Sequence, residues 1–158
     1  MRSKKRLSIV AVVMMLLVSI IGCSWNDQPQ PADDEIMLMI QLDVKEDIGL
    51  LILDKNVNGK PSGGGISNAN KTMLKKNELL YWTESKTDLG AEGDVVDYSV
   101  VFRVITEYCD PNFENIYPEE LTVYLDELSF TAEFGRAYSI TITGDKVNGY
   151  KAVLNESA

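Results

Sequence analysis

Alternation of apolar and polar residues is the main pattern of the chain from residue 36 onward. In four segments apolar side chains occupy every second position, and most of the positions between them are polar. This period of two is typical of strands with one buried and one exposed face, as in antiparallel sheets. The four segments are Ile36–Val44, Val96–Val104, Leu128–Phe134 and Tyr138–Thr143. A fifth run, Leu50–Leu53, is apolar throughout and therefore predicts a central strand.

Turn residues separate these runs. Asn58-Gly59 and Asn148-Gly149 are dipeptides that favour hairpins, because both residue types tolerate a positive φ. Gly135 and Gly144 bracket the run Tyr138–Thr143. About seven or eight strands within residues 36–158 predict an all-β domain, an antiparallel β-sandwich of immunoglobulin-like architecture.

Two segments have patterns that fit either a helix or another structure. Between residues 119 and 128, apolar residues at helical spacing follow Pro118 and two acids, which fits a helix start. The run around Val123 also alternates and is rich in strand-forming residues, so we expect a strand there. Residues 70–80 fit a short helix that begins at Asn70.

The first 22 residues have the order of a secretory signal peptide. A basic cluster within residues 2–6 precedes the apolar run Leu7–Ile21. This run is about 15 residues long, whereas a transmembrane helix needs about 20. It leads into Ile20-Ile21-Gly22-Cys23, which resembles the lipobox of bacterial lipoproteins. An ordinary secretory signal with a chance cysteine is the alternative interpretation.

The lipobox resemblance implies how the chain is processed and where it resides. It implies cleavage by signal peptidase II before Cys23 and a diacylglycerol on the sulfur of that residue. The exported chain would then be anchored in a bacterial membrane, at the outer membrane or the cell surface, depending on the host envelope. Residues 23–35 follow with two prolines and four acids, which predict a flexible tether.

Charge and composition exclude several classes of function. The whole chain has a net charge of −9, and loss of the four cations in residues 1–22 would leave a side-chain charge of −13. Such acidity argues against nucleic acid as a partner, because phosphate neutralisation needs clustered Lys and Arg. The chain has no histidine and two cysteines, which excludes histidine-dependent catalysis and a zinc site built from thiolates. We expect no cofactor.

One motif resembles part of a calcium loop. Asp54, Asn56 and Asn58, followed by Gly59, match the first half of an EF-hand loop. The twelfth position of that loop should be a bidentate glutamate, and here it is Gly65. We therefore favour a plain hairpin turn and keep a weak calcium site as the alternative.

Aromatic residues suggest where a partner would bind. Trp82 follows Tyr81, and alternation places the two rings on opposite faces, so one of them should be exposed. Phe113 and Tyr117 lie in an acidic loop, residues 110–120, which contains two prolines. This loop is a solvated acidic loop, a recognition loop that presents its two aromatic rings, or a site with a glycosidase-like pair of carboxylates.

Together these features predict a membrane-anchored bacterial envelope lipoprotein. We expect its β-sandwich to bind a protein, peptide or glycan without catalysis, with Trp82, Phe113 and Tyr117 as the candidate binding surface. One alternative is a histidine-free hydrolase that cleaves glycans with two carboxylates. The other is a structural or inhibitory partner of another envelope protein, which predicts an exposed apolar patch.

Overall fold

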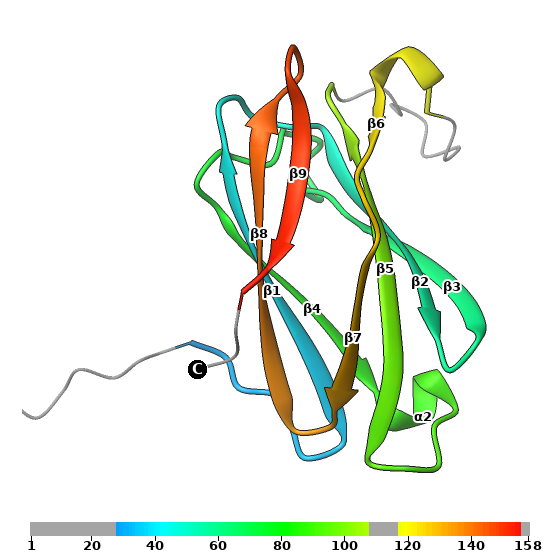
Figure 1. Ribbon diagram of the computed structural model, residues 1–158. Helices are drawn as coiled ribbons and strands as arrows, with labels where there is room; N and C mark the ends of the chain where they lie inside the picture. The colour runs from blue at the N-terminus through cyan, green and yellow to red at the C-terminus, as the bar shows by residue number, and fades with distance from the viewer. Residues whose placement is uncertain (1–27, 108–116, 156–158) are drawn as a thin grey trace, which may run out of the picture.

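The computed structural model describes residues 28–107 and 117–155, which form two stacked β-sheets (Figure 1). The all-β sandwich expected from the alternation is thus confirmed. The described residues form nine strands, slightly more than expected: β1 (Glu35–Val44), β2 (Leu50–Val57), β3 (Lys60–Ile66), β4 (Leu79–Ser85), β5 (Val95–Ile105), β6 (Thr122–Tyr124), β7 (Leu128–Glu133), β8 (Arg136–Asp145) and β9 (Gly149–Leu154).

The first sheet has four strands in the order β4-β1-β8-β9. Its β1–β4 and β8–β9 pairs are antiparallel, but β1 and β8 run parallel, with Ile36 opposite Arg136 and Val44 opposite Gly144. The expected sandwich was purely antiparallel, so this pair is a correction. A parallel pair needs a long connection between its strands, and here most of the chain lies between β1 and β8.

The second sheet has five strands and is entirely antiparallel. Its order is β3-β2-β5, and the far side of β5 is shared by two short strands. β7 pairs with residues 95–100 of β5, and β6 pairs with residues 103–105. Between these two strands the backbone N–H of Leu125 still donates to the carbonyl of Phe102 at 2.9 Å.

The core lies between the two sheets and is built from the alternating residues. In β1 every second side chain from Ile36 to Val44 is buried, and in β5 the same holds from Val96 to Val104. β2 is buried on both faces over Leu50–Leu53, which confirms the predicted central strand. Its outward residues Leu50 and Ile52 form a second, small cluster with Ile105.

The two hairpin dipeptides behave differently. Asn58 and Gly59 both have a positive φ, of 51° and 80°, and close the tight β2–β3 hairpin as expected. Asn148-Gly149 also lies in a hairpin, between β8 and β9, but of these two residues only Gly149 has a positive φ. The turn there is held by Asp145, whose carboxylate accepts the backbone N–H of Asn148 at 2.7 Å.

The two ambiguous segments contain little helix. Residues 70–80 form no helix: Leu74 makes an isolated bridge with Ile48, and Asn70 forms a local turn by accepting the N–H of Thr72. The segment at 119–128 begins with a 3-10 turn, η1 (Glu119–Leu121), and continues as the strand β6.

The α-helix within the described residues is short. It is α2 (Lys86–Leu89), which is capped by the Ser85 hydroxyl accepting the N–H of Asp88. None of the helices in the described ranges has the length and hydropathy that a membrane crossing requires.

Candidate binding face on the five-stranded sheet

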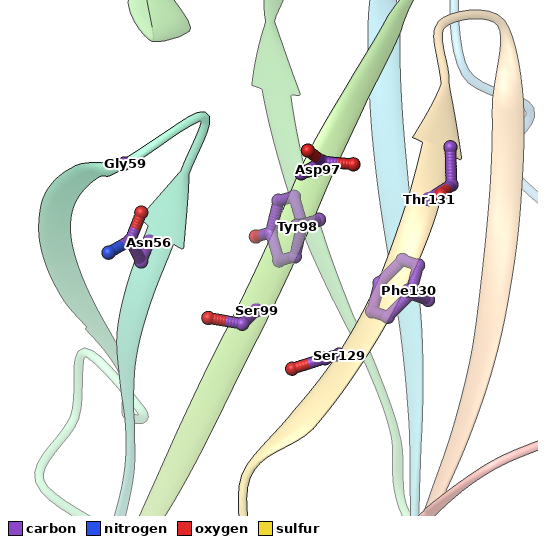
Figure 2. A pocket seen from close by; sticks show the side chains of 8 residues that line it. All are labelled: Asn56, Gly59, Asp97, Tyr98, Ser99, Ser129, Phe130 and Thr131. Carbon is purple, nitrogen blue, oxygen red and sulfur yellow. The ribbon is translucent and has the colours of Figure 1, made fainter.

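The outer face of the five-stranded sheet carries a shallow pocket of about 490 Å³. It spans three neighbouring strands, β2, β5 and β7, and extends to the β2–β3 turn (Figure 2). Most of the lining side chains that point outward are small and polar. The lining residues are Asn56, Gly59, Asp97, Tyr98, Ser99, Ser129, Phe130 and Thr131.

The hollow follows from the register of the strands and the size of their side chains. Asn56 lies opposite Ser99, and Ser99 lies opposite Ser129, so these three outward residues form one row across the sheet (Figure 2). Asp97 and Thr131 form the next row toward the β2–β3 turn. Because the side chain of Ser99 is small, the surface of the sheet is hollowed at the middle of the first row.

Most polar side chains of the pocket have no hydrogen-bond partner within the part of the chain that the structure describes. Within the described residues, no hydrogen bond engages the side chains of Asn56, Ser99, Ser129 or Thr131. The backbone of Asp97 is held by Asn58, which donates its N–H to the Asp97 carbonyl and accepts the Asp97 N–H, both at 2.9 Å. The Asp97 carboxylate has no ion-pair partner among the described residues, and it is the one charged group of the lining.

A buried polar network supports the pocket from below. The Tyr98 ring stacks on Phe130 with centroids 5.2 Å apart, and its hydroxyl donates to Glu84 at 2.7 Å. Lys55, which is 5% exposed, forms an ion pair with the same carboxylate. Glu84 belongs to β4 of the opposite sheet, so this network joins the two layers. No disulfide joins them within the described residues. Burial, and then the Glu84 charge, raise the pKa of Tyr98, so its hydroxyl stays protonated and donates.

A second group of polar and aromatic side chains lies farther along the same face. The Arg103 guanidinium makes two hydrogen bonds to Asp54, Nε to Oδ2 at 2.6 Å and Nη2 to Oδ1 at 2.9 Å. It also lies 5.8 Å from the ring centroid of Tyr124, which is 55% exposed. Arg103 is four residues beyond Ser99 on β5, a distance of about 13 Å along the strand.

Trp82 does not provide the exposed ring that the sequence suggested. Its ring is half-buried at the edge of the sandwich, where it packs on Gly64 and lies 4.5 Å from the Lys55 ammonium. Its Nε1 is buried and has no hydrogen-bond partner among the residues that the structure describes. Tyr81 is the exposed residue of the pair, at 38%.

Tyr117, the other candidate aromatic residue that the structure describes, is not part of the pocket. Tyr117 is half-buried and packs on the small outer cluster that contains Leu50 and Ile105. Phe113, together with Cys109 and the lipobox residue Cys23, lies outside the described residues.

The calcium candidate is a strand and a turn in the structure. Asp54 and Asn56 are alternate residues of β2, and Asn58 begins the turn, so neighbouring members lie about 7 Å apart along the chain. Two of the three already have partners: Asp54 is bound to Arg103, and the Asn58 side-chain oxygen accepts the N–H of Asp97. No group of three or more acidic, cysteine or histidine side chains suited to a metal ion occurs in the described part of the chain.

Comparison with known proteins gives distant structural similarities. No family model and no curated protein matches the chain. A non-hemolytic pneumolysin from Streptococcus pneumoniae aligns with 77% of this chain at 12% identity and a TM-score of 0.39, and the chain spans 23% of its length. The membrane-binding domain of pneumolysin aligns over 94% of its own length, again at 12% identity, with a TM-score of 0.34. Similarities at this level assign no function to the chain.

Proposed function

We propose that this protein is a lipid-anchored envelope lipoprotein whose sandwich binds an external ligand without catalysis. The observation that carries the proposal is the pocket on the outer face of the five-stranded sheet. Its amide, hydroxyl and carboxylate groups have no partner within the described residues, and ligand pockets use a few such polar groups to orient the ligand.

The distribution of carboxylates favours binding over glycan hydrolysis. Glycosidases need two carboxyl groups about 5–9.5 Å apart. The pocket has one, Asp97, and Asp54 on the same face is about four strand positions away, or about 13 Å. Asp54 is also neutralised by Arg103.

The anchor is supported by the sequence Ile20-Ile21-Gly22-Cys23 at the end of the apolar run. We expect the Cys23→Ala variant to lose incorporation of an alkyne-bearing fatty acid in cells of the host. The Cys109→Ala variant is the matched control and should label like the wild type. Equal labelling of both variants would contradict the lipid anchor.

Site-specific crosslinking of the full-length protein in intact cells tests the binding face. A diazirine amino acid would replace Ser129 in the pocket or, as the control, Thr83, which is exposed on the outer face of the other sheet. We expect an adduct from position 129 and little from position 83. No adduct at 129, or equal adducts at both positions, would contradict the assignment of this face.

A further inference from the structure

The chemistry of the pocket defines the class of ligand. Asn56 offers both donors and an acceptor, and the hydroxyls of Ser99, Ser129 and Thr131 can each donate and accept. Such a set matches a ligand whose surface is dense in hydroxyl and amide groups. The only charged residue of the pocket lining, Asp97, is negative, and the mature chain carries a side-chain charge of −13. An acidic ligand would therefore be repelled, locally by Asp97 and at longer range by the whole domain.

An aromatic platform extends this site along β5. Tyr124 is more than half exposed, and its ring is held beside the Arg103 guanidinium. The charge of Arg103 is satisfied by the two hydrogen bonds to Asp54, so it does not recruit anions as a free cation would. The exposed ring of Tyr124 suits the apolar C–H face of a sugar, and the tyrosine hydroxyl can bind the hydroxyl groups at the edge of that sugar.

The spacing of the two parts sets the shape of the ligand. Ser99, in the hydrogen-bonding row, and Arg103, which pairs with Tyr124, are about 13 Å apart along β5. Between them the outward residue of β5 is Val101, which is half-buried and carries no charge. One small sugar cannot span both parts, whereas an extended chain that runs along β5 can.

We propose that the outer face of the five-stranded sheet binds an uncharged, linear glycan, with Asn56, Ser99 and Ser129 as the hydrogen-bonding subsite and Tyr124 as the stacking subsite. This inference rests on the proposed function of the same face. Asp97 acts as the residue that excludes acidic glycans.

Calorimetric titration of the detergent-solubilised full-length protein tests the proposal. The probes are chitohexaose and cellohexaose as neutral chains, hexagalacturonate as an acidic chain of the same length, and N-acetylglucosamine as a single sugar. We expect at least one neutral hexasaccharide to bind about tenfold or more tightly than the acidic chain or the single sugar, a difference of about 1.4 kcal/mol.

Variants distinguish the two subsites from a general effect on the fold. Tyr124→Ala and Ser129→Arg should each weaken the neutral hexasaccharide about tenfold or more, while Thr83→Arg, with the same added charge on the opposite face, should not. The Asp97→Asn substitution should reduce the difference in affinity between the neutral and the acidic hexasaccharide. Melting temperatures of all variants would identify any that fail to fold.

Two results would overturn the glycan assignment: no binding of either neutral hexasaccharide, or neutral binding that Tyr124→Ala leaves unchanged. If position 129 still crosslinks in cells to a protein or peptide, the binding face stands and only the glycan class is wrong. If position 129 also gives no adduct, the proposed function fails as well.

Discussion

Replacing Glu84 by leucine should destabilise the sandwich strongly, because it leaves a buried ammonium without a counter-ion. Lys55 has a side chain that is 2% exposed, and its partner among the described residues is the Glu84 carboxylate. The same carboxylate accepts the Tyr98 hydroxyl at 2.7 Å. The Glu84→Leu variant therefore removes the acceptor for two buried donors at once.

The expected magnitude is a large share of the stability of the domain. Removing one partner of a buried ion pair costs about 3–5 kcal/mol. Single domains unfold with a free energy of about 5–15 kcal/mol, so the loss is roughly a third of the total. The melting temperature should fall by about 10–20 °C.

An exposed ion pair provides the matched control. Lys75 and Asp47 have the same charges at 2.7 Å, but their side chains are 66% and 32% exposed. Exposed pairs contribute about 0–1 kcal/mol, so Asp47→Asn should have a small effect. The contrast between Glu84→Leu and Asp47→Asn isolates burial as the cause.

Urea unfolding followed by circular dichroism measures these differences. The double variant Lys55→Met with Glu84→Leu should recover much of the loss, because no uncompensated charge remains in the core. The reasoning is refuted if Glu84→Leu costs no more than Asp47→Asn, or if the second substitution recovers nothing.

Two further predictions concern other positions. Gly64→Ala should cost about 1–3 kcal/mol in urea unfolding, because the Trp82 ring occupies the space of the new methyl group, whereas Gly63→Ala should cost clearly less. Hydrogen bonds, first from Lys45, lower the pKa of Asp145 below its usual 3.8. The stability that this low pKa contributes is present above the unfolded-state pKa and is lost as the pH falls. In thermal melts, the melting temperature of the Asp145→Asn variant should therefore fall less steeply below about pH 4 than that of the wild type. An unchanged profile would contradict this.

Alternation predicted the faces of the strands but not their partners. The inward residues of β1 and β5 followed directly from the period of two, because burial on one face leaves that pattern in the sequence. The parallel pairing of β1 with β8 left no such signal. Either direction of pairing buries the same side chains, so the choice depends on long-range packing.

The pocket could not be predicted for a related reason. Asp97 and Ser99 were visible as polar positions of a strand, yet they form a site only because the register aligns Asn56 and Ser129 beside them. The alternation also placed Tyr81 and Trp82 on opposite faces, but it did not say which ring was inside.

The inner position of Trp82 is explained by a strand that is distant in the sequence. Gly64 on β3 faces the ring and has no side chain, which leaves the volume that the indole fills. The run of three glycines in β3, residues 63–65, gives no strand signal in the sequence, because glycine is depleted in strands. Recognising the space for Trp82 required knowing that β3 lies opposite β4.

The position of the pocket relative to the start of β1 limits where its ligand would be met. The Glu35 carbonyl accepts the N–H of Gly135 at 2.7 Å, so the chain enters the sandwich beside the β7–β8 turn. Asp97 and Thr131 lie toward this same end, because they pair two positions from the end of β7. Residues 23–32, which precede the turn at residues 33–34, span at most about 36 Å even if fully extended at about 3.6 Å each. If Cys23 carries the proposed lipid, this length sets the greatest distance between the bilayer and the pocket end of the sandwich.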